Sequence, residues 1–458
     1  MSITQAKTRF DSEVASLNVF DSRKRLEMLF DNGLYTEIDR FLKNNENECE
    51  VVAAFGEING MQVYAYAQSA SVNKGAMGKV QASKIAHVYD LAVKTGAPIV
   101  AIFDSEGAHV DEGVDALEAY GLLIKAAGNA SGVVPQISVV AGTCVASAAV
   151  LASLSDAVIM TENADFYITS PAFNDSKNDA DAAVLAAKNG IASLTAKTDD
   201  EAIKLAAELL GYLPSNNLSE PLFTEPAAPV GGDALKDIID AESFFELSAE
   251  QGKSIKVGFA RIGGASVGIV ATQPDENDGY FCVCAARKAA KFVRFCDAFS
   301  IPVITLVDSL GIRLTENCDL SGGVKAVSAL TSAYSEATTP KISIVSGKAV
   351  AGAYIAFVSS AASPDMVYSV PDAVIGAMEP MSAVQLLYKD RLEKGEDRKQ
   401  LEAEYALDVC SPFKAAASGY VTDIVEAGEL AQKVVTALDV LSSKRVSTLS
   451  KKHTNIPL

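Results

Sequence analysis

The sequence contains a long internal duplication. The stretch PQISVVAGTCVASAA at residues 135–149 matches PKISIVSGKAVAGAY at residues 340–354, at an offset of 205 positions. Further upstream, PIVAIFDSEG at 98–107 matches PVITLVDSLG at 302–311, at an offset of 204 positions. Matched blocks that keep their order and nearly constant spacing indicate two copies of one folding unit.

The segment between the two copies has the composition of a linker. LPSNNLSEPLFTEPAAPVGG, at residues 213–232, contains four prolines and ends in two glycines. These residues interrupt helices and strands, so the segment is expected to connect rather than to pack. A chain of 458 residues is also long for one domain. We expect an N-terminal domain at 1–213, a linker at 214–232 and a C-terminal domain at 233–458.

Within each copy, apolar runs alternate with helical patterns. In the first copy a strand at 98–103 precedes a loop at 104–113 and a helix at 115–127. Alternation of this kind is typical of parallel strands joined by crossover helices. The expected fold class is therefore α/β, with the same arrangement in both halves.

The repeated block predicts a strand, a sharp turn and the start of a helix. In the second copy the β-branched run at 342–345 favours a strand, and Ser346 with Gly347 allows a turn. Small apolar residues from Val350 onward then favour a helix. The unpaired N–H groups at a helix start suit a negatively charged oxygen. The duplication thus predicts two backbone sites for oxyanions, one in each copy.

Composition argues against several other classes of function. A formal net charge of −19 would repel a nucleic acid backbone. Seven scattered cysteines and three histidines show no spacing for a zinc or other metal site. The N-terminal residues lack the apolar core of a signal peptide. We expect reduced cysteines and a cytoplasmic location.

Catalysis by side chains has little support. The chain has no GxSxG, HExxH, Walker A or GxGxxG motif. Asp104 and Asp308 end matching strands, where each is expected to cap the following turn. Cys144 lies at a turn that favours a thiolate, but no base stands beside it. His109 could serve as an acid or base, although a packing role is favoured over it. Backbone N–H groups remain as the main chemistry.

Several motifs together resemble one enzyme family. They are SRKRLEMLFDNG, DSEGAHVDEGV, SGVVPQISVVAGTC, LPSNN, GFARIGGASVGIVATQP, KAAKFVRFCDAFSIPVITLVD and ATTPKISIVSGKAVAGAY. They resemble motifs of the carboxyltransferase (β-type) subunits of biotin-dependent acyl-CoA carboxylases, of the propionyl-CoA carboxylase and methylmalonyl-CoA carboxyltransferase kind. The resemblance covers nearly the whole chain.

The resemblance implies a fold and a reaction. The fold would be two duplicated crotonase-like (ClpP/crotonase) ββα-spiral domains. The first half would hold the acyl-CoA and the second half carboxybiotin, with the active site between the first half of one subunit and the second half of a partner. Carboxybiotin would release CO2, its ureido group would take the α-proton, and the acyl-CoA enolate would attack the CO2.

The resemblance also implies partners. Biotin would be carried by a partner protein, because this chain has no AMKM-like attachment sequence and no ATP-grasp region. The partners would be a biotin carboxyl carrier protein and a biotin carboxylase subunit. The chain itself would form a homo-oligomer, either a dimer with facing N and C domains or a hexamer.

Carried over by motif, the resemblance assigns residues to the two oxyanion sites. The catalytic backbone groups are those of Ala146 and Ser147 in the first half and of Gly352 and Ala353 in the second. The substrate-binding residues are Gly107, Ala108, Cys144, Gly311 and Tyr354.

The sequence departs from the family pattern in the first half. VASA at 145–148 replaces the usual AGGA, Glu106 replaces a glycine, and His109 replaces an arginine. Side chains at these positions narrow the first oxyanion site, and Glu106 adds a negative charge beside a forming enolate. These changes favour an altered acyl substrate or a weakened first site.

Three other functions stay open. The chain could be the carboxyltransferase component of a biotin-dependent acyl-CoA decarboxylase, which runs the reaction in reverse. It could be a non-catalytic structural partner subunit with a degraded N-terminal site, as the changed motifs suggest. A crotonase-type hydratase or thioesterase would share the fold, but the LPSNN and FCDAF blocks speak against it.

Overall fold

The computed structural model describes residues 3–17, 20–44, 47–169, 181–313, 320–447, 450–452 and 454–455. The chain divides into two compact units, Met1–Glu220 and Pro221–Leu458. Their boundary lies inside the predicted linker at 214–232. Each unit contains one eight-stranded sheet, and the strands of the two sheets follow one another in corresponding order.

The sheet of the first unit begins with an antiparallel hairpin and continues with parallel strands. Its order is β1(Tyr35–Ile38), β4(Val52–Ile58), β5(Met61–Ala67), β6(Ile99–Ser105), β7(Gln136–Val145), β8(Ala157–Thr161) and β10(Leu194–Ala196), with β9(Asp165–Tyr167) also paired to β7. Asn59 and Gly60 join β4 to β5 with positive φ angles of 52° and 74°. This is the turn that an Asn-Gly pair predicts.

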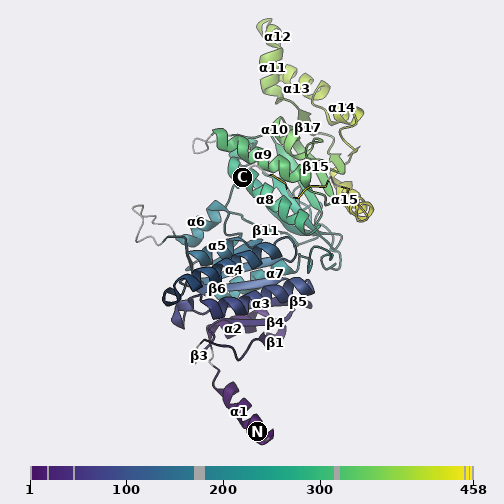
Figure 1. Cartoon of the computed structure of the whole chain (residues 1–458). Helices are drawn as coiled ribbons and strands as arrows, with labels where there is room; N and C mark the ends of the chain where they lie inside the picture. Colours follow the sequence, from purple (N-terminus) through teal and green to yellow (C-terminus); the bar gives the residue numbers. More distant parts are fainter. Residues whose placement is uncertain are drawn as a thin grey trace. The chain divides into compact units, whose positions relative to one another are not determined.

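Helices pack against the sheet of the first unit. They are α2(Asp21–Leu29), α3(Lys79–Thr95), α4(Val114–Ala130), α5(Ser147–Ser153), α6(Ala182–Asn189) and α7(Asp199–Leu210) (Figure 1). Their apolar faces form the hydrophobic core with the strands, and Ile85, Val88 and Leu123 there have no exposed surface. The β–α alternation predicted from sequence is present as parallel pairing of β5, β6, β7 and β8.

The second unit repeats this design. Its sheet order is β11(Phe245–Leu247), β12(Ile255–Ile262), β13(Ala265–Thr272), β14(Val303–Ser309), β15(Lys341–Val350), β16(Met366–Ser369) and β18(Asp423–Ile424), with β17(Val374–Gly376) also paired to β15. Its covering helices include α8(Val283–Ala298), α9(Leu320–Glu336), α10(Gly352–Phe357) and α15(Ala427–Leu441). Gly263 and Gly264 turn the β12–β13 hairpin, as the sequence predicts.

Four further helices lie between β17 and β18, whereas the described part of the corresponding connection in the first unit, from β9 to β10, contains the helix α6. They are α11(Pro380–Leu387), α12(Lys389–Glu393), α13(Arg398–Asp408) and α14(Pro412–Ala417) (Figure 1). A small core of Ala383, Val384, Leu401, Tyr405 and Cys410 holds this group together. The predicted charged helical stretch at 389–405 corresponds to α12 and most of α13.

The predicted linker is held at both of its ends. Asn216 donates its side-chain N–H to the Gly96 carbonyl (2.8 Å), so the start of the segment packs on the first unit. Thr224 donates its backbone N–H to the Gly264 carbonyl (3.0 Å), so a later part packs on the β12–β13 hairpin of the second unit. The segment without regular structure therefore belongs in part to each unit.

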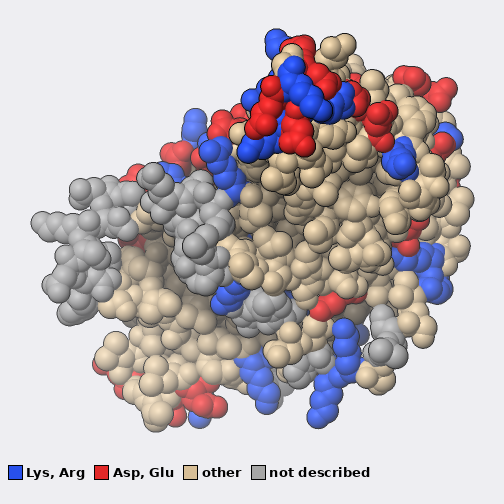
Figure 2. Space-filling model, turned by 90° about the horizontal axis from the view of Figure 1, so that it is seen from above, with Lys and Arg blue, Asp and Glu red and all other residues tan. Residues whose placement is uncertain are grey.

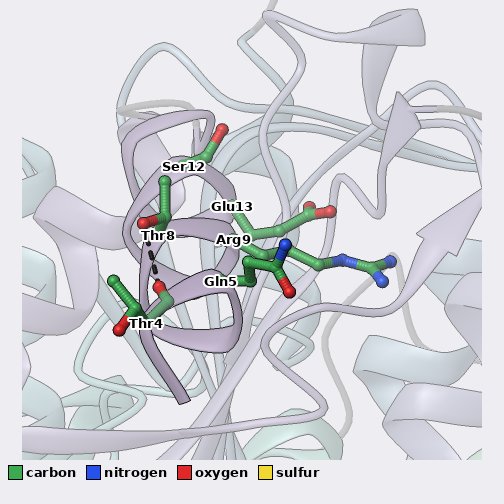
Figure 3. A pocket seen from close by; sticks show the side chains of 6 residues that line it. All are labelled: Thr4, Gln5, Thr8, Arg9, Ser12 and Glu13. Carbon is green, nitrogen blue, oxygen red and sulfur yellow. Dashed lines mark hydrogen bonds between the residues drawn. The ribbon is translucent and has the colours of Figure 1, made fainter. Parts of the chain in front are cut away.

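The N-terminal helix α1(Ile3–Ala15) has no buried residue. Its polar face carries Thr4, Gln5, Thr8, Arg9, Ser12 and Glu13, which line a shallow hollow (Figure 3). All six lining side chains come from this one helix, and Glu13 among them is paired with Lys43 Nζ (3.1 Å). We do not regard it as a candidate active site.

Charged side chains of both signs share the surface. In the dense cluster at the top of the face drawn in Figure 2, Lys and Arg lie beside Asp and Glu. In the part of the chain that the structure describes, no helix combines the length and the apolar character needed to span a bilayer.

Candidate active site

Strands β7 and β15 each contain a bulge near their carboxyl ends. In the first unit the pairing of β6 with β7 shifts from Phe103–Val140 to Ser105–Cys144. In the second unit the pairing of β14 with β15 shifts in the same way, from Val307–Val345 to Ser309–Ala349. The predicted turn at Ser346 and Gly347 is therefore wrong, because the strand continues through the bulge to Val350.

The two strand-end aspartates hold these bulges. Asp104 Oδ1 accepts a hydrogen bond from the Thr143 N–H (3.3 Å), and Asp308 Oδ1 accepts one from the Lys348 N–H (2.9 Å). A Cβ atom on Gly142 would lie 2.3 Å from Asp104 Oδ1, so glycine is required there. The prediction that Asp104 and Asp308 cap the turns that follow them is wrong, because each carboxylate binds the bulge of the neighbouring strand.

A strained corner follows each bulge. Ala146 has φ 54° and ψ −124°, and Ala351 has φ 49° and ψ −118°. This region of φ and ψ is unfavourable for any residue with a Cβ atom. The Ala146 N–H donates to the Tyr167 carbonyl (2.8 Å), and the Ala351 N–H donates to the Gly376 carbonyl (3.0 Å). The short strands β9 and β17 therefore hold the two corners through these hydrogen bonds.

A short helix begins directly after each corner. In α5 the Val150 N–H donates to the Ala146 carbonyl (3.3 Å), and in α10 the Ile355 N–H donates to the Ala351 carbonyl (3.2 Å). The residues between each corner alanine and the first donor within the helix have N–H groups with no acceptor in their own helix. In the first unit these groups start at Ser147. In the second unit they include those of Gly352 and Ala353.

The loops after β6 and β14 lie against the corners. Ser105 Oγ accepts the Gly107 N–H (3.1 Å), and Ser309 Oγ accepts the Gly311 N–H (3.2 Å). Both glycines have left-handed backbones, with φ 104° and 119°. A Cβ atom on Gly311 would lie 3.6 Å from the nitrogen of Gly352. The structure therefore brings the predicted residue Gly311 next to the predicted donor Gly352.

The first unit shows the same approach. A Cβ atom on Gly107 would lie 3.6 Å from the Val145 carbonyl oxygen and 3.8 Å from the Ala146 Cβ atom. Ala108 forms an isolated parallel bridge with Met77, whose N–H donates to the Gly107 carbonyl (2.8 Å). The loop that carries Gly107 and Ala108 is thus fixed beside the corner at Ala146.

The corner of the second unit opens into a pocket of about 550 Å³. Its lining residues are Ala351, Gly352, Tyr354, Ile355, Ile375, Gly376, Ala377, Val409, Lys414, Ala415, Ser418 and Tyr420. Tyr354 is half-buried, and burial raises the pKa of its hydroxyl, so the phenol is protonated at neutral pH. A mostly apolar wall with a few amide donors is typical of a site for a small organic ligand.

Comparison with known proteins identifies the family. The carboxyl transferase domain matches residues 20–456. The methylmalonyl-CoA decarboxylase subunit alpha of Veillonella parvula is 36% identical over 95% of this chain and 93% of its own length. The propionyl-CoA carboxylase carboxyltransferase subunit of Haloferax mediterranei is 34% identical, over 95% and 93%.

The chain belongs to the carboxyl transferase family. The crystal structure of transcarboxylase 12S, a hexamer with methylmalonyl-CoA and methylmalonic acid bound, matches it with a TM-score of 0.89. The identity is 32%, and the match covers 95% of this chain and 92% of that one. The predicted family and the predicted fold of two duplicated crotonase-like domains are confirmed.

Two residues of this carboxyl transferase differ from their predicted roles. The Ala146 N–H is already donated to Tyr167, so the free donors of the first corner begin at Ser147 rather than at Ala146. The Cys144 side chain is fully buried in the core of the first unit, and burial raises the pKa of its thiol. That thiol is protonated and has no exposed surface.

The negative charge that Glu106 adds to the first half has a cation partner that was not predicted from the sequence. Glu106 Oε2 accepts a hydrogen bond from Lys74 Nζ (2.9 Å), and both side chains are exposed. Lys74 lies in the loop at 69–79, where its counterpart in the second copy is Asp278, so the repeat does not mark a cation at this position. His109 is half-buried and its backbone N–H donates to the Met77 carbonyl (2.8 Å).

Proposed function

We propose that the chain is the carboxyltransferase subunit of a biotin-dependent enzyme. It moves a carboxyl group between carboxybiotin, carried by a partner protein, and the α-carbon of a small acyl-CoA. The observation that carries this function is the pair of matched corners, each with N–H groups free at the start of a short helix. Membership of the carboxyl transferase family supplies the chemistry to which such corners are suited.

Biotin is a substrate for this chain, because it arrives on another protein. Bound as carboxybiotin, it would supply CO2 when its N–C bond breaks, and the ureido nitrogen freed in this way would accept the α-proton. The chain's own part is electrostatic: backbone N–H groups stabilise the negative oxygen that forms on the thioester and the oxygen of the ureido ring. Fixed donors in a largely apolar site stabilise such charges without reorganisation. This explains why the sequence shows no obvious general base.

We assign the two corners to the two substrates. Gly352 and Ala353 bind the ureido oxygen, with Gly311 against the corner and Tyr354 in the pocket wall. The pocket fits this ring, since it is mostly apolar, about 550 Å³ in volume and opens at the amide donors. In the first unit Ser147 supplies an N–H to the acyl-CoA enolate.

The loop carrying Gly107 and Ala108 completes the acyl-CoA site. Ala146 forms the strained corner of this site. Cys144 contributes main-chain atoms to it but no side chain.

The direction of the reaction has two candidates. Subunit alpha of methylmalonyl-CoA decarboxylase, from Veillonella parvula and from Propionigenium modestum, is 36% and 33% identical to this chain. This similarity favours the decarboxylase direction as a second candidate beside carboxylation. Beside these two directions, a structural subunit without activity is a third candidate function, because the side chains of Ala146 and Ser147 narrow the first corner.

We further propose the assembly. The relatives are subunits of larger enzymes by their names, and the transcarboxylase 12S structure is a hexamer. For this chain we expect a homo-oligomer, either a dimer or a hexamer, that works with a biotin carboxyl carrier protein and a biotin carboxylase subunit. A cytoplasmic location is also expected from the cysteine usage.

The deciding experiment links CoA-ester decarboxylation to free biotin. Purified protein is incubated with malonyl-CoA or methylmalonyl-CoA, with and without biotin as carboxyl acceptor. Turnover that depends on biotin is the expected result. A correctly folded protein that turns over neither ester would overturn the proposal and favour the structural subunit.

Proline substitution tests the second corner directly. Ala353→Pro removes one N–H at the second position of α10 and should lower kcat about 10²-fold, the usual effect of losing one oxyanion donor. Gly428→Pro is the matched control, at the second position of α15 with no atom near its Cβ. It should keep activity. Equal activity of both variants would show that the Ala353 N–H plays no part.

A further inference from the structure

The pocket of the second unit contains an unused cation. Among the described residues that line it, Lys414 is the one with a charged side chain. The remaining lining side chains are apolar or carry hydroxyl groups. Lys414 is an exposed residue, so its amino group keeps contact with solvent while the residue borders the pocket.

The fold directs this lysine toward the pocket. Helix α14 begins after Ser411, whose Oγ accepts the Phe413 N–H (3.3 Å), and Pro412 occupies its first position. Lys414 and Ser418 are four residues apart, hence on the same side of the helix, and both line the pocket. Phe413 is 59% exposed and does not line it. The helix lies beside β17, which supplies Gly376 to the same wall (Figure 1).

The amino group of Lys414 has no partner among the residues that the structure describes. Two arginines of the same helical group are paired with glutamates: Arg391 Nη1 binds Glu404 (2.6 Å), and Arg398 Nε binds Glu402 (2.7 Å). Glu404, an acidic residue of the same group, is therefore already engaged. Lys414 is left available for an anion that enters the pocket.

We propose that Lys414 binds the carboxylate on the ureido nitrogen of carboxybiotin and so distinguishes it from biotin. This assignment rests on the proposed function, which places the ureido ring in this pocket. The two forms of the ring share the oxygen that Gly352 and Ala353 would bind. They differ by one negative charge on the ureido nitrogen. Amide donors to the oxygen distinguish the two forms poorly, whereas a nearby cation distinguishes them by its attraction for the carboxylate.

A structural role for Lys414 predicts something else. The methylene groups of a lysine often cover apolar surface while the amino group stays in water. Lys414→Met keeps most of this cover and removes the charge, whereas Lys414→Arg keeps the charge. The two variants therefore separate charge recognition from packing. Both leave the backbone donors and the exposed position of the side chain unchanged.

The test measures binding and needs no turnover. The probes are biotinamide, which is neutral, and its N1-carboxymethyl derivative, a stable ureido ring with a carboxylate. We expect the wild-type protein to bind the carboxymethyl probe about fivefold more tightly than the neutral probe, as one partly exposed ion pair allows. Lys414→Met should lose this preference and Lys414→Arg should keep it. The preference should shrink as salt is added.

Each outcome decides a separate claim. A wild-type protein without preference, or a Lys414→Met variant that keeps it, overturns the assignment of Lys414. Biotin-dependent turnover of CoA esters in the same preparation would show that the proposed function still stands. If turnover is absent but the preference depends on Lys414, the pocket binds carboxylates and the proposed function fails instead. Thermal unfolding of both variants confirms that they are folded.

Discussion

Arg25 Nη1 donates a hydrogen bond to Asp104 Oδ2 (3.0 Å), and this ion pair lies beneath the bulge that leads to the first corner. Arg25 is 8% exposed and also binds Asp199 through Nε (2.8 Å). The other oxygen of Asp104 accepts the Thr143 N–H. In the second unit Asp308 binds its bulge without an ion pair among the described residues. Among the described residues, an ion pair therefore supports the first corner and none supports the second.

Loss of this brace should destabilise the first unit. Arg25→Met leaves Asp104 and Asp199 without their cation in a largely buried place, which typically costs about 3 kcal/mol. We expect the urea midpoint of the first unit to fall accordingly. Lys433→Met is the control, because it removes a cation of an exposed pair with Asp423 and should leave the midpoint unchanged. Equal shifts in the two variants would contradict a structural role for Arg25.

Glycine at the corners should stabilise the protein. Ala146 and Ala351 hold φ and ψ values that cost a residue with a Cβ atom about 1 kcal/mol or more. Ala146→Gly and Ala351→Gly should each raise the free energy of unfolding by up to about 1 kcal/mol, reduced by the freedom that glycine gains when unfolded. Chemical denaturation measures this. Ala148→Gly, inside α5, is the matched control and should destabilise. Destabilisation by all three would mean that the corners carry no strain.

Much of the fold could be predicted because its signals are local. The Asn59-Gly60 turn and the duplicated strand blocks can be found in short stretches of sequence. The bulge at Gly347 could not, since Ser-Gly suits a turn as well as a bulge. The choice is made by Asp308, which comes from another strand and binds the Lys348 N–H.

The candidate site was predictable to a similar extent. The repeat located both corners, but the acceptor that occupies the Ala146 N–H is the Tyr167 carbonyl, on a strand that follows later in the chain. Lys414 has no motif, and only the packing of α14 beside β17 brings it to the pocket. Long-range contacts of this kind leave no local pattern in a single sequence.

The negative charge of Glu106 should lower kcat/KM for the acyl-CoA more strongly when its partner Lys74 is removed. Lys74 Nζ lies 2.9 Å from Glu106 Oε2, and its positive charge partly offsets the negative charge of Glu106 beside the first corner. Lys74→Met should therefore lower kcat/KM for the acyl-CoA about twofold, because exposed charges act weakly through water. Glu106→Gln together with Lys74→Met should restore the wild-type value. The biotin-linked assay at low salt measures both. A double variant no better than Lys74→Met would exclude an electrostatic effect of Glu106.

Lys288 should make stability depend on pH. It is 3% exposed, its Nζ donates to the Ser248 carbonyl (3.2 Å), and burial lowers its pKa from 10.5 to about 8. Below pH 8 the folded protein must keep a buried charge, which costs on the order of 3 kcal/mol for this shift. Between pH 8 and 10.5 the folded state has released the proton and the unfolded state still binds it. This cost therefore disappears as the pH rises through that window.

Lys288→Met removes the cost at every pH, so the variant should be more stable than the wild type at pH 7, with the difference shrinking toward pH 10. The difference between the two proteins is the quantity to measure, because buried cysteines such as Cys296 have raised pKa values and change stability in the opposite direction. Lys341 also has a pKa lowered to about 8 and is unaltered in both proteins. Urea denaturation at pH 7, 8, 9 and 10 gives the difference directly. A difference that stays constant over this range would show that Lys288 does not release its proton in the folded state.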